Sequence, residues 1–298
     1  MTTPVDIDAI MNQPERVRAW RRVAETVADR VGPLVDLSRP YVDGFENLPR
    51  DGRFLLVGNH TQGGVEAFLI PYLVRRAIGM RVRPLADRGM GRMRGPAGDL
   101  FAACGVVVGA PETARELMRH DEPILVFPGG GREIPKFKGE ENTLRWHGRA
   151  GFARLSVEND YPIVPVGLVG GDDVYRSLTT REGLWGRLSQ GLTEKRSGRS
   201  DMALPLMHGI GPTLIPRPQR MYLRFGAPID TTKPTRVSEE KWVATVKQNT
   251  RVSLERILAD LLVVRTGDPY RELTHWPGAP RPSHQPSTDK VMAAAECN

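Results

Sequence analysis

The sequence between residues 54 and 66 is Phe-Leu-Leu-Val-Gly-Asn-His-Thr-Gln-Gly-Gly-Val-Glu. Four apolar residues followed by a glycine are typical of a buried strand, and the apolar spacing from Glu66 to Ile78 predicts a helix. The turn between them carries His60. In an α/β protein, such a turn lies at the carboxyl edge of the sheet, where these folds bind their ligands. We therefore expect a functional site at this turn.

The alternation of short strands and helices continues along the chain. Further strands are predicted over residues 82–86, 106–108, 124–127, 163–169 and 221–225, and further helices over residues 112–119, 149–158 and 238–264, the last as one helix or two. This order predicts an α/β fold with a mixed, mostly parallel sheet flanked by helices. Residues 172–216 break the alternation, and we expect them to leave the sheet and to form a short apolar helix over residues 184–192.

The chain ends differ from this central pattern. Residues 14–31 have the spacing of an amphipathic helix, with Val17, Trp20 and Val23 among its apolar positions and arginines over much of the remainder. Such a helix packs on the protein body or lies on an anionic bilayer, with Trp20 at the headgroups, and both alternatives stay open. We expect an N-terminal helical segment over residues 1–44, an α/β domain over residues 45–275 and a disordered tail over residues 276–298.

The composition is that of a globular protein with a basic surface. Of 298 residues, 40% are hydrophobic and 26% are charged, which excludes wholesale disorder. Lys and Arg exceed Asp and Glu by 42 − 35 = 7, which favours anionic partners such as phosphates or an acidic membrane face. Seven arginines lie between residues 75 and 94. Aromatic residues make up 6% and no recognised nucleic-acid motif is present, so we do not expect nucleic acid as a partner.

The sequence also indicates where the protein works. Two cysteines exclude a disulfide scaffold and fit a reducing compartment. The longest clean apolar stretches, such as residues 67–74, are far shorter than the roughly 20 residues of a transmembrane helix. The N-terminus lacks the apolar core of a signal peptide. We expect a cytoplasmic protein that is peripheral on the inner face of the membrane.

His60 and Glu66 suit general-base chemistry. An imidazole exchanges a proton near neutral pH, and the two glycines at 63 and 64 allow the chain to fold back. Glu66 could then hold one imidazole nitrogen and fix the tautomer, as in a Ser-His-Asp triad without its serine. The nucleophile would be a hydroxyl of the substrate. The alternative is that His60 is a capping or core histidine.

A second glycine-rich turn follows the predicted strand at residues 124–127. Gly129, Gly130 and Gly131 expose backbone N–H groups that could bind an anion or a developing oxyanion, and Arg132 can pair with a phosphate or carboxylate. The alternative is a plain glycine turn with a structural arginine. The turn does not match the dinucleotide or P-loop patterns, so it does not indicate a nucleotide site. The chain has no G-x-S-x-G, H-E-x-x-H or C-x-x-C motif, so we expect no metal.

Taken in order, these segments resemble the glycerolipid acyltransferase family, also called lysophospholipid acyltransferase-like. That family pairs an Asn-His-x4-Asp block with a Phe-Pro-Glu-Gly-x-Arg-Ser block and a Val-Pro-Ile-Val-Pro-like strand. In this chain, Asn59-His60 opens the first block, residues 127–133 match the second and residues 161–166 match the third. Residues 105–109 and 225–229 resemble two further blocks, and the resemblance extends over residues 45–235.

The departures from the family pattern point to one branch. The acid follows the histidine one position later than usual, at Glu66, and Gly109 and Gly129 replace an arginine and a glutamate. With Arg132 and Lys136, these features look like the branch of plant phytyl ester synthases and mono- and diacylglycerol acyltransferase-like proteins. Members of that branch esterify neutral alcohols.

The resemblance implies an acyltransferase domain that moves a fatty acyl group from acyl-CoA or acyl carrier protein to a lipid alcohol, here a neutral acylglycerol, at an anionic membrane surface. It implies His60 as general base and Glu66 as its partner, with no cofactor besides the acyl donor. The implied substrate-binding residues are Thr61, Gln62, Gly129, Gly130, Gly131, Arg132 and Lys136. A lysophospholipid (1-acylglycerol-3-phosphate) acyltransferase and a non-catalytic lipid-binding protein on the same scaffold remain alternatives. The sequence leaves the oligomeric state open.

Overall fold

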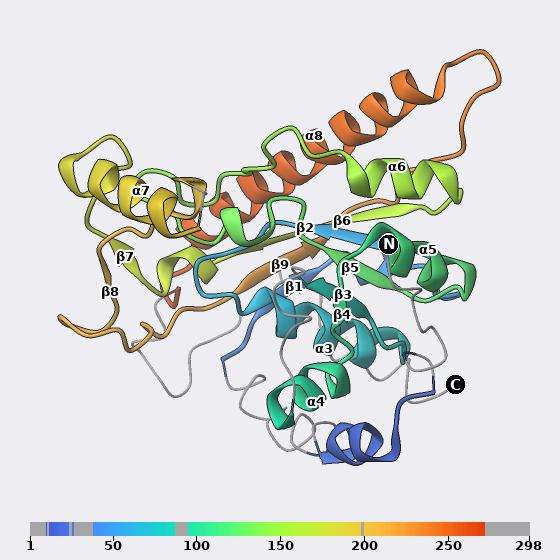
Figure 1. Ribbon diagram of the computed structural model, residues 1–298, viewed down its shortest axis with the longest axis horizontal. Coiled ribbons are helices and arrows are strands. Elements are labelled where there is room, and N and C mark those ends of the chain that lie inside the picture. Colours follow the sequence, from blue (N-terminus) through green and yellow to red (C-terminus); the bar gives the residue numbers. More distant parts are fainter. Residues whose placement is uncertain are drawn as a thin grey trace.

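The computed structural model describes residues 10, 12–23, 26, 38–86, 95–197 and 200–271. Its centre is a seven-stranded sheet in the order β1-β9-β6-β2-β5-β3-β4, with helices on both faces (Figure 1). The strands are β1 (Tyr41–Asp43), β2 (Leu55–Gly58), β3 (Arg83–Ala86), β4 (Val107–Val108), β5 (Ile124–Val126), β6 (Ile163–Val169) and β9 (Tyr222–Phe225). Neighbouring strands run parallel except for β6 and β9. The predicted α/β fold with a mixed, mostly parallel sheet is confirmed.

The helices follow the predicted order. They are α3 (Glu66–Ile78), α4 (Pro96–Ala103), α5 (Pro111–Arg119), α6 (Gly151–Glu158), α7 (Leu184–Ser197) and α8 (Glu239–Thr266). The helix α3 ends where predicted because Gly79 adopts φ +73° and donates its N–H to the Arg75 carbonyl at 2.9 Å, the usual glycine cap of a helix C-terminus. The C-terminal region forms one helix, α8, and the short helix α4 was not predicted.

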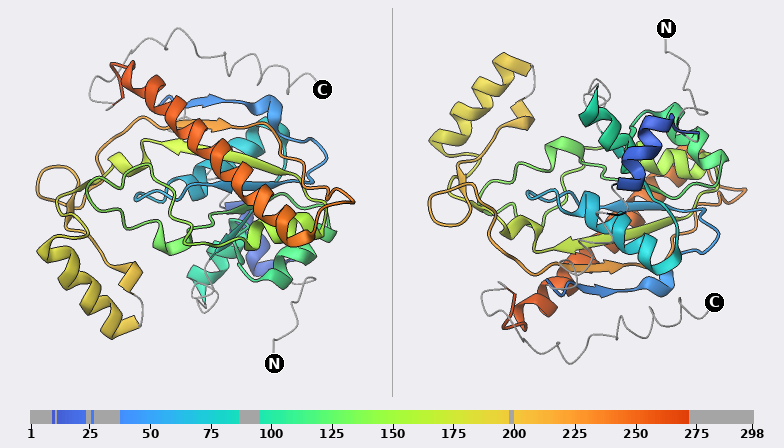
Figure 2. Two further views of the ribbon diagram at one scale, coloured as in Figure 1. Left: turned by 90° about the horizontal axis from the view of Figure 1, so that it is seen from above. Right: turned by 90° about the horizontal axis from the view of Figure 1, so that it is seen from below.

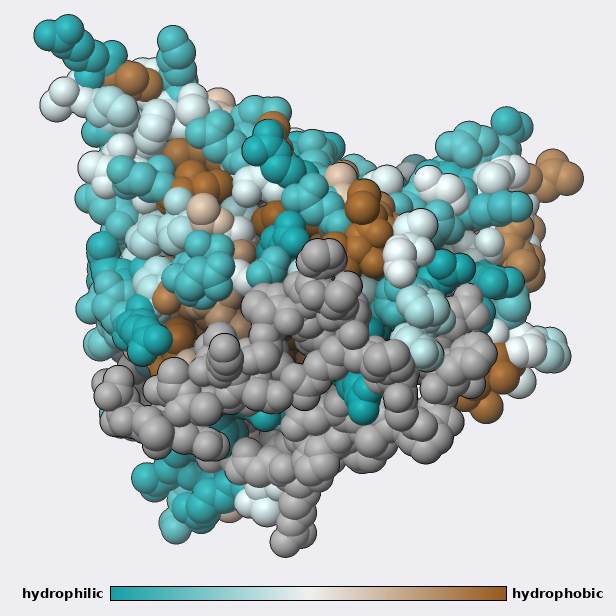
Figure 3. Space-filling view, turned by 180° about the vertical axis from the view of Figure 1, so that it is seen from behind, coloured by the Kyte–Doolittle hydropathy of each residue, from teal (hydrophilic) through white to brown (hydrophobic). Residues whose placement is uncertain are grey.

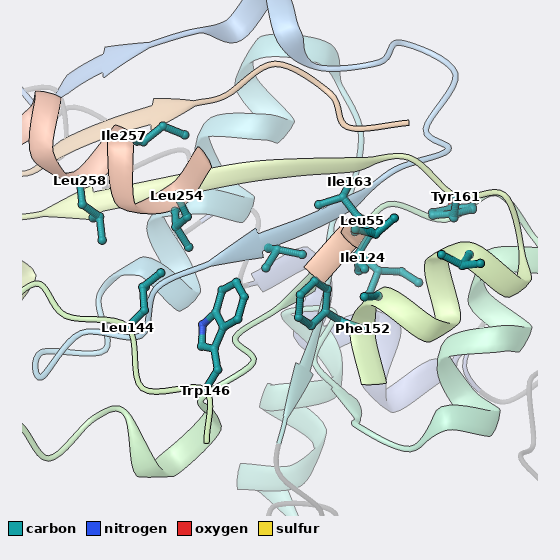
Figure 4. Close-up of a cluster of buried hydrophobic side chains, with 14 of the residues drawn as sticks. Leu55, Ile124, Leu144, Trp146, Phe152, Tyr161, Ile163, Leu254, Ile257 and Leu258 are labelled. Atoms are coloured by element: carbon teal, nitrogen blue, oxygen red, sulfur yellow. The ribbon is translucent and has the colours of Figure 1, made fainter. Parts of the chain in front are cut away.

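Two apolar cores lie on opposite faces of the sheet. Along β2, Leu55 and Val57 pack into the core that α5, α6 and α8 cover, whereas Leu56 packs into the core that α3 covers. Figure 4 shows the first core, where side chains from β2, β5 and β6 meet those of α6 and α8. All seven residues of β6 are buried, which explains its continuous apolar run, since a central parallel strand is covered on both faces.

Residues 172–216 leave the sheet, as predicted. They contain the two-stranded sheet of β7 (Arg176–Ser177) and β8 (Met207–His208), the helix α7, and the 3-10 helix η5 (Ser200–Met202). Figure 2 shows α7 standing at one end of the molecule, away from the helices that cover the central sheet.

The N-terminal segment is only partly described. Residues 15–23 are helical, with Val17 buried and Trp20 and Val23 exposed, and the side chain of Gln13 donates to the Ala102 carbonyl at 2.7 Å. Most of the predicted helix beyond residue 23 and the predicted tail at 276–298 lie outside the described residues. The strand β1, at one edge of the central sheet, lies within the predicted N-terminal segment 1–44, and it pairs with β9. Within the described ranges, no helix has the length and apolar character to cross a bilayer.

The predicted basic cluster at residues 75–94 is only partly surface. Arg83 is buried and its guanidinium pairs with Glu122 at 2.6 Å, and Arg81 donates to the Ala102 carbonyl at 3.2 Å. These two arginines therefore hold β3 and the end of α4 in place. Arg88, Arg92 and Arg94 lie outside the described residues.

Candidate active site

The sheet order brings the two predicted turns together. The strands β2 and β5 are parallel neighbours in a register that pairs Val57 with Val126, so the turns that follow them meet at the same edge. The rings of His60 and Phe127 stack with centroids 4.5 Å apart and planes 16° apart. This edge is where α/β sheets place their ligands, and both candidate motifs lie there.

His60 is paired with Glu66 as expected. The imidazole Nδ1 makes a hydrogen bond with Glu66 Oε1, and the Glu66 side chain is fully buried whereas 15% of the His60 side chain is exposed. The Glu66 carboxylate can only accept a hydrogen bond, so the neutral imidazole carries its proton on Nδ1. Nε2 is then the nitrogen that is available to a substrate. The geometry is that of a carboxylate-oriented general base.

Thr61 holds the carboxylate of Glu66 from the other side. Its backbone N–H donates to Glu66 Oε1 at 3.0 Å, and its hydroxyl donates to Glu66 Oε2. Thr61 is itself fully buried. Thr61 therefore positions the Glu66 carboxylate. Its predicted role in substrate binding stays a prediction.

The glycines of this turn make the pairing possible. Gly64 adopts φ +65°, a left-handed conformation that folds the chain back toward Glu66 at the start of α3. At Gly63, an added Cβ would lie 2.8 Å from a methyl group of Val174, so only glycine fits against this part of the segment 172–216. The predicted role of the two glycines in bringing Glu66 back to His60 is confirmed.

Asn59 and Gln62 anchor the turn at both ends. The Asn59 amide donates to the Leu168 carbonyl and accepts from the Leu168 N–H, both at 2.9 Å, which ties the turn to β6. The buried side chain of Gln62 donates to Ser177 Oγ at 3.1 Å and to the Met207 sulfur at 3.3 Å, which ties the turn to β7 and β8. Gln62 thus holds residues 172–216 against the turn. Its predicted contact with substrate stays a prediction.

Lys136 also helps to hold the turn that follows His60. Its side chain is fully buried, its ammonium lies 3.2 Å from Asp172 Oδ2, and it donates to the Thr143 carbonyl at 3.0 Å. The other carboxylate oxygen of Asp172 accepts from the Gln62 N–H at 2.7 Å. Lys136 therefore holds Asp172, and Asp172 holds the turn after His60. The predicted contact between Lys136 and substrate stays a prediction.

The glycine-rich turn contains the 3-10 helix η3 (Gly130–Arg132). Gly130 donates its N–H to the Phe127 carbonyl at 2.8 Å, so it is committed within the turn. The predicted role of the other two glycines of the run, Gly129 and Gly131, in binding an oxyanion stays a prediction. Arg149 holds the turn by donating to the Gly129 carbonyl at 3.1 Å. Arg132 pairs with Asp201 of η5, with 2.5 Å between Nε and Oδ2.

Glu133 is a site residue that the sequence analysis missed. Its side chain is fully buried, and a Cβ added at Gly129 would lie only 2.0 Å from Glu133 Oε2. The carboxyl of Glu133 therefore occupies the space that a side chain at position 129 would need. A sequence signal for this exists, because the related family has a glutamate at the position of Gly129 and this chain has one four residues later.

Burial raises the pKa of Glu133 from 4.5 to about 7. The positive charges of Lys136 and His60 and the backbone N–H of His60 act in the opposite direction, and the carboxylate of Asp172 adds to the increase. The raised pKa therefore belongs to a buried carboxyl beside Gly129 of the glycine-rich turn.

Replacing Glu133 with glutamine should change the pH dependence of stability. Between pH 4.5 and about 7 the folded protein retains a proton that the unfolded chain releases, so this carboxyl lowers stability as pH rises through that interval. We expect the free energy of unfolding of E133Q, relative to wild type, to rise by up to about 3 kcal/mol over this range and then to stay constant. Urea unfolding of both proteins from pH 5 to pH 8 measures the difference, and parallel profiles would contradict it.

In the part of the chain that the structure describes, no group of three or more His, Cys, Asp and Glu side chains is arranged to hold a metal ion. The fold and site together define an α/β protein with a carboxylate-held histidine beside a glycine turn at the carboxyl edge of its sheet. Residues 39–169 match the protein-family model described as Acyltransferase.

Similar proteins carry related names. The chain is 28% identical over 249 residues to phytyl ester synthase 2, chloroplastic, of Arabidopsis thaliana, which covers 78% of this chain and 35% of that protein. It is 26% identical over 137 residues to the human DGAT1/2-independent enzyme synthesizing storage lipids. This match covers 46% of the present chain and 42% of the human protein. Among solved structures, the 1-acyl-sn-glycerophosphate (LPA) acyltransferase PlsC from Thermotoga maritima aligns over 91% of this chain and 88% of its own, with a TM-score of 0.48 and 15% identity. The chain thus spans about a third of the length of the phytyl ester synthase.

Proposed function

We propose that the protein is a membrane-associated O-acyltransferase that moves a fatty acyl group from acyl-CoA or acyl carrier protein to a neutral lipid alcohol. The observation that carries this proposal is the pairing of His60 Nδ1 with the buried carboxylate of Glu66, beside the glycine turn. The match to the Acyltransferase family model and the relatives named as phytyl ester synthases support the reaction class.

In the proposed reaction, His60 Nε2 accepts the proton of the alcohol while the alcohol oxygen forms a bond to the thioester carbonyl carbon. The carbon–sulfur bond then breaks, and the leaving thiolate takes the proton from the imidazolium, so that ester and thiol form and His60 is again neutral. The negative charge of Glu66 stabilises the imidazolium. The backbone N–H groups of Gly129 and Gly131 stabilise the oxyanion, where loss of a single donor costs about 10²–10³-fold in rate.

Thiol release from acyl-CoA tests the proposal. The purified protein is mixed with acyl-CoA or acyl carrier protein and with phytol, monoacylglycerol or diacylglycerol, and free thiol and ester are measured together. We expect thiol release that depends on the alcohol and matches the ester formed. Binding of these lipids without thiol release from either donor would identify a lipid-binding protein instead.

The pairing of Arg132 favours a neutral acceptor over a lysophospholipid. An arginine that binds an acceptor phosphate should offer its charge to the site, but Arg132 is neutralised by Asp201 at 2.5 Å. The two side chains are 28% and 24% exposed, so solvent weakens the pair only in part. The proposed acceptor therefore carries no phosphate that needs Arg132.

The variants Arg132→Gln and Asp201→Asn test the acceptor. For monoacylglycerol, we expect both to lower kcat/KM by a similar factor below about tenfold, because each only breaks a partly exposed ion pair. We also expect wild type to prefer monoacylglycerol to lysophosphatidic acid. If lysophosphatidic acid is preferred, and R132Q abolishes that preference while D201N increases it, the acceptor is anionic and the neutral-alcohol assignment is wrong.

A further inference from the structure

The helix α7 exposes its apolar side and buries its polar side. Leu184, Leu188 and Leu192 follow one another at four-residue spacing on one face, and 90%, 55% and 57% of these residues are exposed. The opposite side carries Ser189, which is buried and exchanges hydrogen bonds of 3.0 Å with the backbone of Leu204. A helix packed on its own protein normally has the reverse orientation.

The exposed leucines belong to a larger apolar surface at this end of the molecule. Ten exposed large apolar side chains lie between residues 178 and 215, namely Leu178, Leu184, Trp185, Leu188, Leu192, Leu204, Leu206, Ile210, Leu214 and Ile215. Figure 3 shows apolar side chains at the protruding end on the right of that view. A gathering of exposed apolar side chains at one end of a molecule points to contact with a protein or a membrane.

The charges on α7 favour a membrane with acidic lipids. Arg187, Lys195 and Arg196 are exposed on the helix, against one acid, Glu194. Basic side chains around an apolar stripe are the pattern of helices that lie in a bilayer interface, where the leucines enter the acyl region and the cations meet anionic headgroups. Trp185, at the edge of the stripe, is the residue type enriched at that depth.

The apolar surface is joined to the candidate active site. Trp185 Nε1 donates to the Leu204 carbonyl at 3.1 Å, which fixes α7 to the segment that follows η5. From η5, Asp201 pairs with Arg132 of the glycine turn, and Gln62 beside His60 reaches β7 and β8. Lipid contact at α7 therefore places a bilayer against the elements that hold both halves of the site.

We infer that α7, through its face of Leu184, Leu188 and Leu192, is a docking surface that inserts into the interface of an anionic bilayer. The inference rests on the proposed function for its choice of a lipid partner, but it assigns membrane contact to an element distinct from the N-terminal helix. The inference would be opposed by the finding that a second copy of the chain, or another protein, covers this face.

The test uses the full chain and sedimentation with phosphatidylcholine vesicles, with and without phosphatidylglycerol. Changing the three leucines together to glutamine should weaken binding to the anionic vesicles at least about tenfold, because burial of each leucine is lost. The matched control changes Val252 and Val263, two exposed apolar residues of α8, to glutamine and should bind as wild type does. Unchanged thermal unfolding shows that the variants are folded.

Two further readouts separate this inference from the proposed function. Acyl transfer between water-soluble short-chain substrates should be equal in wild type and the leucine variant, whereas a His60 variant should lose transfer and still bind vesicles. Brominated lipid should quench fluorescence of wild type more than that of W185F. Equal vesicle binding by the leucine variant, absence of Trp185 quenching, or conversion of a dimer to a monomer with vesicle binding unchanged would overturn the inference.

Discussion

Replacing His60 with alanine is expected to lower acyl transfer to a lipid alcohol by about 10²–10⁴-fold, the usual contribution of a general base. In the proposed reaction the imidazole Nε2 receives the alcohol proton, and alanine offers no replacement. The fold should persist, because the backbone of the turn is held by Asn59 and Gln62 rather than by the ring. Initial rates of thiol release and of ester formation measure the loss.

The matched control for this change is His120→Ala. His120 is an exposed histidine at the end of α5, so its loss should leave both the rate and the thermal midpoint unchanged. If H60A retains the wild-type rate while it remains folded, His60 is not the base, and the pairing with Glu66 serves only to shape the turn.

Replacing Glu66 with glutamine should have the second-largest effect, a decrease of about 10²–10⁴-fold in kcat with little change in KM. Glutamine preserves the shape but removes the charge that stabilises the imidazolium. It also places an N–H₂ group next to His60 Nδ1 or Thr61 Oγ1, where the carboxylate now accepts hydrogen bonds from both residues. The equivalent Asp-to-Asn change in serine proteases lowers kcat by about 10⁴-fold because the histidine adopts the wrong tautomer.

The control for Glu66 is Glu122→Gln. Glu122 also pairs with a basic side chain, but its partner is Arg83 of β3. We expect E122Q to lower stability and to leave kcat near wild type. Equal losses of kcat in E66Q and E122Q would show that the effect of E66Q comes from general destabilisation and not from the loss of charge beside His60.

Local sequence signals were sufficient for most of the fold. The bounds of α3 followed from its apolar spacing and from Gly79, which ends the helix through its own backbone. The edge strand β1 was not predicted, because it has only three residues and pairs with residues 222–224, far along the chain. No local sequence pattern indicates such a strand. Likewise, the leucine spacing predicted a helix around residues 184–192 but could not show that the leucines face outward.

The part of the candidate site whose residues lie close together in the sequence could be predicted. His60 and Glu66 are six residues apart on one loop, and the glycines between them reveal the close approach. The pairing of Lys136 with Asp172 could not be predicted, because the sequence shows the charge of Lys136 but not its burial, and Asp172 lies on a distant loop. Glu133 was missed for the same reason, because only the fold places its carboxyl in the space left by Gly129.

A side-by-side time course of labelled ester formation by wild type, H60A and E66Q, supplied with acyl-CoA or acyl carrier protein and a panel of neutral lipid alcohols, tests whether a carboxylate-held histidine transfers the acyl group. Wild type should form ester with at least one pair of substrates, and both variants should be slower by about 100-fold or more. Equal rates in the three folded proteins, or no ester from any pair with wild type, would contradict a base-assisted acyl transfer at His60.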